Sequence, residues 1–181
     1  MSAAPPAAGP RFTIRRAAPE DAVPLAGLAE RTFRDTYAEH NTTEDMAGYI
    51  AAHFGVRQQT AELGDPARLT LLAEAGGAAA GYVQLGWGPA PGCVRGGAPM
   101  EVIRFYVDRV WHGHGLAQLL MAAAVGAARD AGAGVLWLGV WERNARAIAF
   151  YRKSGFEDVG AQTFVLGTDH QRDRVLARPL T

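Results

Sequence analysis

The sequence has a single cysteine, Cys93, among 181 residues, and it has no net charge. One cysteine excludes an internal disulfide and a zinc site built from clustered cysteines, and it is typical of proteins from a reducing cytoplasm. Lys+Arg and Asp+Glu are balanced at 18 each. Because no whole-surface basic field exists to attract nucleic acid or anionic lipid, we expect no nucleic-acid partner. The lone cysteine leads us to expect a cytoplasmic protein.

The sequence also lacks an apolar run long enough to cross a bilayer. The longest run, LAQLLMAAAVGAA (116–128), is short, rich in alanine and interrupted by Gln118. The first ten residues, MSAAPPAAGP, lack the charged start and strongly apolar middle of a signal peptide, and their prolines prevent a helix. We therefore predict a disordered tail over residues 1–10, one domain over residues 11–181, and no membrane partner.

What the sequence does contain is an alternation of strand-like and helix-like segments. Period-two and buried apolar runs predict strands over 11–17, 68–75, 79–87, 100–107, 134–141, 156–167 and 172–180. Helical spacing predicts helices over 19–37, from Thr43 onward, over 115–132 and over 144–155. The order β-α-α-β-β-β-α-β-α-β-β predicts an α/β (α+β) domain with a mixed, mostly antiparallel sheet and helices on both faces.

The segment VDRVWHGHGLAQLL (107–120) joins the central strand to the longest helix and has three interpretations. A metal site is disfavoured because His112 and His114 supply only two ligands, with no obvious third nearby, so we expect no metal. A phosphate cradle has a mechanism, because a helix N-terminus offers free N–H groups and glycine lets a phosphate approach them. An ordinary strand-to-helix turn is the third alternative. The dinucleotide fingerprint fails because Gln118 stands where its third glycine is required.

Several of these motifs together resemble the GCN5-related N-acetyltransferases. HGHGLA (112–117) is similar to the pyrophosphate loop of that family, IRFYV (103–107) to its central strand, and NARAIAFYRKSGF (144–156) to its Asn-containing loop and Tyr-bearing helix. Two positions depart from the family pattern. His112 stands where Gln or Arg is usual, and Ile103 stands where relatives often carry an acidic residue.

A narrower resemblance is to the bacterial spermidine/spermine acetyltransferases. It is carried by TFRDTYAEHNTTEDM (32–46), IRFYV, WLGVWERNARAIAFYRKSGF (137–156) and GTDHQRDRVLARPL (167–180). This resemblance implies a small-molecule amine as the acceptor, a polyamine being favoured, and acetyl-CoA as the donor. The alternatives are a peptide N-terminus, an antibiotic amine, or a module that binds acyl-CoA without catalysis. The oligomeric state is not fixed by the sequence, and a homodimer is one candidate.

The family resemblance also implies roles for particular residues. The donor would be held by the backbone of Phe105, Tyr106 and Val107, by Asn144, and by the loop residues His112, Gly113, His114, Gly115, Leu116 and Ala117. The Tyr151 hydroxyl would lie near the sulfur as the general acid. Helical periodicity alone makes Tyr151 a core aromatic, and Asn144 is equally well suited to be a helix N-cap.

The acceptor side is predicted from charge and strand alternation. Glu101 is the candidate general base, since alternation would place it on one face with Ile103, Phe105 and Val107. The alternative is a solvated carboxylate at the end of a strand. Asp35 and Tyr37, in the FRDTY segment, are the candidate acceptor-binding residues, because a carboxylate there would attract a cationic amine. An acetyl-enzyme formed on Cys93 is disfavoured by its Gly/Pro-rich loop, which has no histidine nearby.

Overall fold

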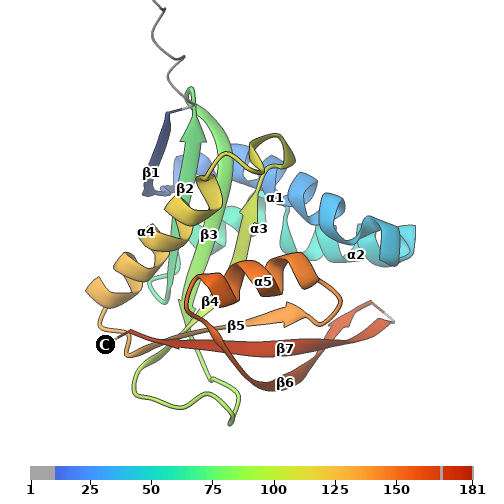
Figure 1. Cartoon of the computed structure of the whole chain (residues 1–181). Helices are drawn as coiled ribbons and strands as arrows, with labels where there is room; N and C mark the ends of the chain where they lie inside the picture. Colours follow the sequence, from blue (N-terminus) through green and yellow to red (C-terminus); the bar gives the residue numbers. More distant parts are fainter. Residues whose placement is uncertain (1–10, 168, 181) are drawn as a thin grey trace, which may run out of the picture.

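The computed structural model describes residues 11–167 and 169–180. The predicted tail over residues 1–10 lies outside the described residues. Seven strands form one sheet in the order β1-β2-β3-β4-β5-β7-β6 (Figure 1). The strands are β1 (Phe12–Arg16), β2 (Arg68–Ala75), β3 (Ala78–Trp87), β4 (Pro99–Val107), β5 (Val135–Trp141), β6 (Glu157–Leu166) and β7 (Asp169–Pro179). Every neighbouring pair is antiparallel except β4 and β5. The predicted mixed, mostly antiparallel sheet is confirmed.

Helices connect and cover this sheet. They are α1 (Ala22–Tyr37), α2 (Thr43–His53), α3 (Val56–Leu63), α4 (Leu116–Asp130) and α5 (Ala145–Lys153). There are also three short 3-10 turns. The turn η1 (Pro19–Asp21) precedes α1, η2 (Ala38–His40) follows α1, and η3 (Arg109–Trp111) follows β4. The helix α3 was not predicted as a separate element; Gly55, which has extended backbone, caps its start and separates it from α2. Among the described residues, no helix has both the length and the apolar character needed to cross a membrane.

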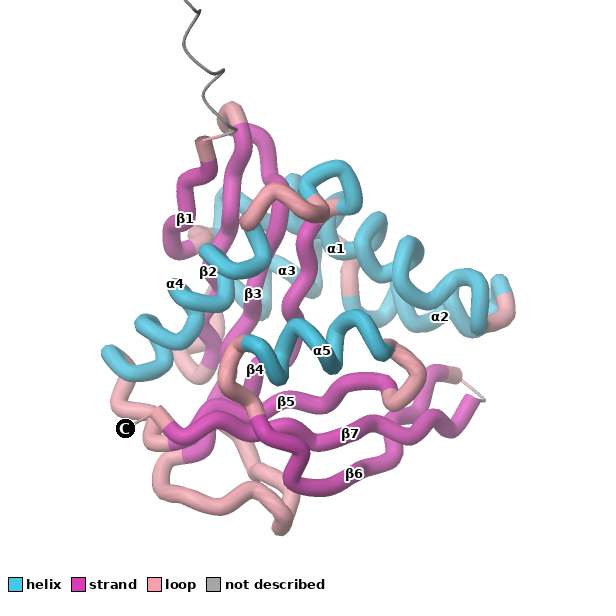
Figure 2. Tube along the Cα trace, viewed as in Figure 1, coloured by secondary structure: helices cyan, strands magenta, loops and turns pink. Residues whose placement is uncertain are grey.

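The helices divide between the two faces of the sheet, as Figure 2 shows. One core contains α4 and α5 side chains such as Leu120 and Tyr151, packed on Leu85, Leu138 and Leu176 of the strands. The other core packs α1 and α2 against β2 and β3; it includes Leu28, Phe33, Met46, Leu72 and Tyr82. The sequence prediction of helices on both faces is therefore confirmed.

A β-bulge in β4 changes which side chains share a face. The β3–β4 register shifts between Gln84/Arg104 and Leu85/Val102, so that Ile103 is the extra residue. Paired residues of a sheet point to the same side, and Glu101 pairs with Gly86 while Phe105 pairs with Val83. Glu101 therefore lies on the opposite face from Phe105 and Val107. The expectation that these residues share one face was wrong, because a bulge reverses the alternation.

The parallel strands β4 and β5 separate soon after they meet. They pair only from Pro99 to Glu101 on β4 and from Val135 to Trp137 on β5. Beyond this point the edge of β4 that faces β5 has no strand partner, although its other edge stays paired to β3 up to Val107. The two strands thus open a slot in the middle of the sheet, next to the start of α4.

Candidate active site

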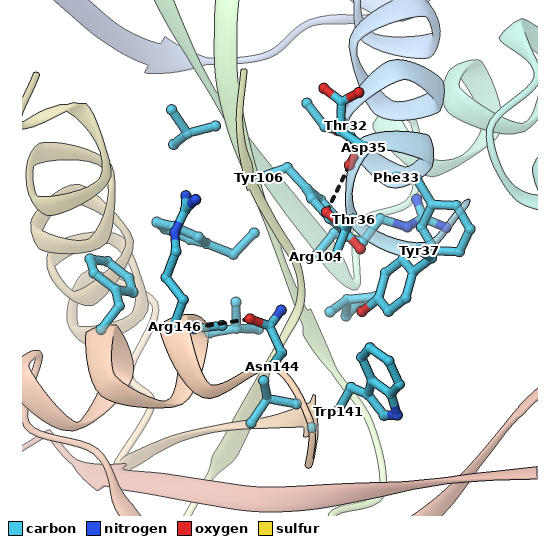
Figure 3. A pocket seen from close by; sticks show the side chains of 18 of the residues that line it. Thr32, Phe33, Asp35, Thr36, Tyr37, Arg104, Tyr106, Trp141, Asn144 and Arg146 are labelled. Atoms are coloured by element: carbon cyan, nitrogen blue, oxygen red, sulfur yellow. Dashed lines mark hydrogen bonds between the residues drawn. The ribbon is translucent and has the colours of Figure 1, made fainter. Parts of the chain in front are cut away.

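The slot between β4 and β5 is part of one large cavity of about 1360 Å³. This volume exceeds the roughly 300–1,000 Å³ of ordinary small-molecule pockets, which fits a site for two substrates. Figure 3 shows its two sides, with Asn144 and Arg146 at the start of α5 and with Asp35 and Tyr37 on α1. We refer to the part lined by residues 109–118 and α5 as the donor side, and to the part lined by α1, α2 and β5–β7 as the acceptor side.

The loop on the donor side presents bare backbone at a helix start. Gly113 and Gly115 both have φ of 82°, the left-handed conformation that glycine adopts without strain. A Cβ atom placed on either glycine would meet no atom within 4 Å, so the space above the loop is open. Within the described chain, no acceptor pairs with the backbone N–H groups of Gly113, Gly115, Leu116, Ala117 and Gln118. This arrangement is suited to an anion such as a phosphate.

The side chain of His112 lines the cavity and contacts two other elements. One ring nitrogen, Nε2, lies 2.9 Å from the Val107 carbonyl oxygen, and Nδ1 lies 3.0 Å from Nη2 of Arg146. His112 therefore ties the end of β4 to α5. Arg146 is exposed and lines the cavity, so it brings a permanent positive charge close to the loop. Sequence reasoning missed Arg146 because only the fold brings α5 beside the start of α4.

A metal site is not formed by the two histidines of this loop. His114 Nδ1 contacts the His112 carbonyl oxygen at 3.0 Å, and the ring lies edge-on to Trp111. Residues 11–167 and 169–180 contain no group of three His, Cys, Asp or Glu side chains arranged to hold a metal ion.

Helix α5 positions two of the predicted residues beside the slot. The Asn144 carboxamide oxygen accepts a hydrogen bond from the Ala147 N–H at 3.1 Å, so Asn144 is the N-cap of α5, and it also lines the cavity (Figure 3). Tyr151 is 8% exposed and packs against Phe105 and Phe156, yet it too lines the cavity. Burial, followed by the influence of Tyr37, raises the pKa of Tyr151 above its usual range. The hydroxyl therefore stays protonated at neutral pH.

The acceptor side is lined by aromatic rings. The Tyr37 and Trp141 ring centroids are 6.1 Å apart, and the ring of His40 lies 4.9 Å from Trp141. Burial, then the nearby Asp173 carboxylate, raises the pKa of Tyr37 to about 12, while a hydrogen bond with Tyr106 acts in the opposite direction. Asp35 is an exposed side chain at the edge of the same cavity. The predicted pair Asp35 and Tyr37 thus lines one cavity, with Tyr37 inside it.

A buried carboxylate that sequence reasoning missed lies among these groups. Asp173 of β7 pairs with Trp141 of β5 on one side and with Gln162 of β6 on the other. Its side chain is largely buried and lines the cavity. Burial, followed by repulsion from Glu142, raises the pKa of Asp173 to about 6. The sequence held one signal of this close approach. It is Gly139 in the buried strand run VLWLGVW (135–141), because a glycine inside a strand often marks the place where another group comes close to the backbone.

Glu101, the predicted base, lies at another end of the cavity. Burial raises its pKa, and the positive charge of Arg68 opposes this shift. Nearby, Arg104 donates hydrogen bonds to the buried Glu62 carboxylate and lies over the Phe54 ring at 4.9 Å. Burial alone would raise the pKa of Glu62, but the hydrogen bond and positive charge of Arg104, together with the hydrogen bonds from Gln58 and Gln84, outweigh burial and lower that pKa. This end of the cavity therefore has paired charges, unlike the surroundings of Asp173.

Cys93 lies outside the cavity lining. Its side chain packs with the loop residues Ala90 and Val94 against a small cluster that includes Val135 and Trp137. It is a partly buried packing residue in this structure.

Comparison with known proteins supports the geometry. Residues 27–156 match the model of the acetyltransferase (GNAT) family. The chain belongs to the GNAT family of acetyltransferases. An uncharacterised N-acetyltransferase of Mycobacterium tuberculosis is 35% identical over 161 residues, covering 88% of this chain and 98% of that protein. The predicted enzyme class, an acyltransferase, is confirmed, and a purely non-catalytic module is not favoured.

Solved structures agree with the family. The PaiA N-acetyltransferase of Thermoplasma acidophilum, solved with coenzyme A, has a TM-score of 0.77 at 20% identity, covering 93% of this chain and 99% of that one. Nourseothricin acetyltransferase has a TM-score of 0.55 at 32% identity, covering 65% and 68%. The first likeness shows the fold, and the free N–H groups of Gly113 and of residues 115–118, with the open space above Gly113 and Gly115, are suited to the pyrophosphate of a coenzyme A group.

Proposed function

We propose that this GNAT enzyme transfers an acetyl group from acetyl-CoA directly to the primary amine of a small cationic molecule, with a polyamine as the favoured acceptor. The observation that carries the proposal is the composition of one cavity. It joins an anion-binding helix start to an aromatic compartment with acidic groups inside and at its edge. Aromatic faces and carboxylates attract ammonium groups, whereas an uncharged amine would gain little from them.

The donor side supplies binding and positioning. The backbone N–H groups of Gly113 and of residues 115–118 would hold the pyrophosphate, and the unpaired edge of β4 at Phe105 to Val107 would hold the pantetheine arm. Arg146 adds a positive charge where His112 replaces the usual Gln or Arg. Bound acetyl-CoA supplies the acetyl thioester. Holding it beside the acceptor accounts for much of the rate of such reactions.

Tyr151 and Asn144 act at the reacting end of the slot. The Tyr151 hydroxyl, which burial keeps protonated, would donate a proton to the departing sulfur. Asn144 fixes the start of α5 by capping it and thereby fixes the position of Tyr151 two turns later. Burial raises the pKa of Glu101, but the bulge at Ile103 places Glu101 on the opposite face of β4 from Phe105.

The acceptor class is tested with a panel of amines. Purified enzyme and acetyl-CoA would be mixed with spermidine, spermine, a lysine-containing peptide with a free N-terminus, and nourseothricin, and free thiol would be measured. Nourseothricin is included because of the resemblance to nourseothricin acetyltransferase. We expect the fastest thiol release with a polyamine. Faster release with the peptide N-terminus would contradict the proposal, and faster release with nourseothricin would move the acceptor to the antibiotic class.

A further inference from the structure

The acceptor side contains a carboxylate whose surroundings differ from those of the other acidic groups of the cavity. Glu62 is held by Arg104, and Glu101 lies near Arg68. No cation is paired with the Asp173 carboxylate among the described residues, and no hydrogen bond to its oxygens contributes to its acidity. A buried carboxylate without a partner is costly to the folded state, and a cationic ligand that pairs with Asp173 would offset this cost.

The strand β5 is shaped to let this carboxylate reach the slot. A Cβ atom added to Gly139 would lie 3.2 Å from Asp173 Oδ2 and only 2.7 Å from Gln162 Nε2. Both side chains therefore lie over the bare backbone of Gly139. Since Gly139 is on the strand that forms one wall of the slot, the carboxylate projects toward the place where donor and acceptor would meet.

The rings around Asp173 are suited to an ammonium group. Trp141 is its direct cross-strand neighbour, and the Tyr37 ring lies 6.1 Å from the Trp141 ring. Cations bind favourably within about 6 Å of such ring centroids. A cation seated there would lie beside the Asp173 carboxylate.

We propose that Asp173 accepts the proton of the acceptor ammonium, so that the amine becomes a nucleophile inside the cavity. This assignment rests on the proposed function, because it requires an amine acceptor on the aromatic side. It moves the general base from Glu101 on β4 to β7. Gln162 and the rings of Tyr37 and Trp141 are positioning residues for the same amine.

The proton balance of the reaction agrees with one base and one acid. The ammonium loses one proton to the Asp173 carboxylate, and the free nitrogen lone pair forms a bond to the carbonyl carbon while the carbon–sulfur bond breaks. The second proton lost by the nitrogen is matched by the one that the sulfur receives through Tyr151. The products are the N-acetyl amine and a thiol, and Asp173 passes its proton to solvent before the next cycle.

The charged and titratable groups around Asp173 set the pH dependence. They are Tyr37 of α1, His40 of η2, Tyr49 of α2, and Glu142 after β5, which lies 4.0 Å from Arg172. Glu142 is the one whose negative charge raises the pKa of Asp173. A base works only when deprotonated, so kcat/KM for the amine should fall as the pH drops through about 6.

The first test is Asp173→Asn, which preserves shape and removes the base. With spermidine at pH 7.5, kcat should fall about 100-fold, and the fall in kcat/KM near pH 6 should disappear. The matched control is Asp158→Asn on the neighbouring strand β6, whose carboxylate pairs with Arg174 outside the cavity; it should keep the parent pH profile. A variant that raises KM but leaves kcat unchanged would overturn the role as base, since Asp173 would then only anchor the cation.

Glu142→Gln provides a second test that keeps Asp173 itself intact. Removing the neighbouring negative charge should move the acid limb of kcat/KM to lower pH with little change at pH 8. An acid limb that stays in place would contradict the assignment. Melting temperatures at pH 7 identify unfolded variants, and Asp173→Asn should melt no lower than the parent, because a buried unpaired carboxylate is destabilising.

A binding experiment separates this inference from the proposed function. The Asp173 carboxyl signal, assigned by its absence in Asp173→Asn, would be titrated by 13C NMR with and without spermidine. A bound cation should lower the pKa of that carboxyl. Failure of spermidine to bind in calorimetry would contradict the polyamine proposal, whereas spermidine that binds without moving the Asp173 signal would overturn the inference about Asp173.

Discussion

The donor and acceptor sides of this cavity are built in opposite ways. The donor side is made mostly of backbone from one short segment, residues 112–118, with the neighbouring edge of β4. The acceptor side is made of side chains from α1, α2, β5, β6 and β7, which span the chain from Thr32 to Asp173. A backbone site depends on glycine and a helix start, whereas a side-chain site depends on how distant elements pack together.

This difference has a functional consequence. A backbone cradle binds the same phosphate group whatever surrounds it, so it suits a donor that the whole family shares. Side chains from separate elements can change one by one, and each change alters which amine fits. We therefore expect substitutions on the donor side to act on affinity for acetyl-CoA, and substitutions on the acceptor side to act on the amine.

The largest effect should come from Tyr151, where the two sides meet. Tyr151→Phe removes only the hydroxyl, so kcat should fall about 100-fold or more while acetyl-CoA affinity stays near the parent value. The measurements are kcat with the best amine of the panel and acetyl-CoA binding by calorimetry. Stability should change little, because no hydrogen bond within the described chain is lost.

Tyr82→Phe is the matched control for this prediction. Tyr82 is buried, its hydroxyl has no hydrogen-bond partner among the described residues, and it lies outside the cavity lining. Loss of activity in both variants would indicate general damage to the core. Full kcat in Tyr151→Phe would return Tyr151 to a packing role, as helical periodicity alone suggested.

A smaller effect is expected from adding one methyl group to the donor loop. Gly115→Ala places a Cβ in the open space above the loop, so the dissociation constant for acetyl-CoA should rise about tenfold, or ~1.4 kcal/mol. Gly132→Ala controls for backbone strain, since Gly132 has φ of 85°, equally open surroundings and a place beyond the far end of α4. Equal affinities in the two variants would remove the phosphate role of the loop.

The same contrast explains how much of the structure could be predicted from the sequence. The Gly76–Gly77 turn between β2 and β3 and the Thr42 cap of α2 are local features, each formed by residues that are close together in the sequence. The family motif in residues 112–117 could also be recognised from the sequence, because its residues are consecutive. The bulge at Ile103, however, depends on pairing with β3, so the predicted shared face of Glu101 and Phe105 failed.

The acceptor side was harder to predict for the same physical reason. Asp35 and Tyr37 could be predicted as acceptor-binding residues because they belong to one segment that resembles a known branch, and that role stays a prediction. Asp173 could be recognised as a residue of the acceptor side only from the sheet order, which places β7 between β5 and β6. Its environment depends on burial and on Glu142, and neither can be deduced from a single sequence without the fold.

A substitution at Arg146 tests whether a charged side chain adds to the binding of acetyl-CoA by the backbone of the donor side. Arg146→Ala should raise the dissociation constant for acetyl-CoA about fivefold at low salt, and added salt should reduce the difference, since the guanidinium is exposed. Arg152→Ala, on the same helix but outside this cavity, should bind like the parent. An unchanged affinity for Arg146→Ala would mean that backbone N–H groups alone bind the phosphate.

The smallest effect should come from Asp35, because its carboxylate is exposed and lies at the cavity edge. Asp35→Asn should raise the KM for spermidine about two- to threefold at low salt, with the KM for acetyl-CoA unchanged, since an exposed charge contributes at most about 1 kcal/mol. Salt near 0.5 M should remove the difference, because the Debye length is then only about 4 to 5 Å. Asp130→Asn, which removes an exposed carboxylate at the end of α4, should leave both constants at parent values. Identical kinetics for Asp35→Asn and the parent at low salt would mean that the cation is drawn in by the interior of the acceptor side, with Asp173 as its carboxylate.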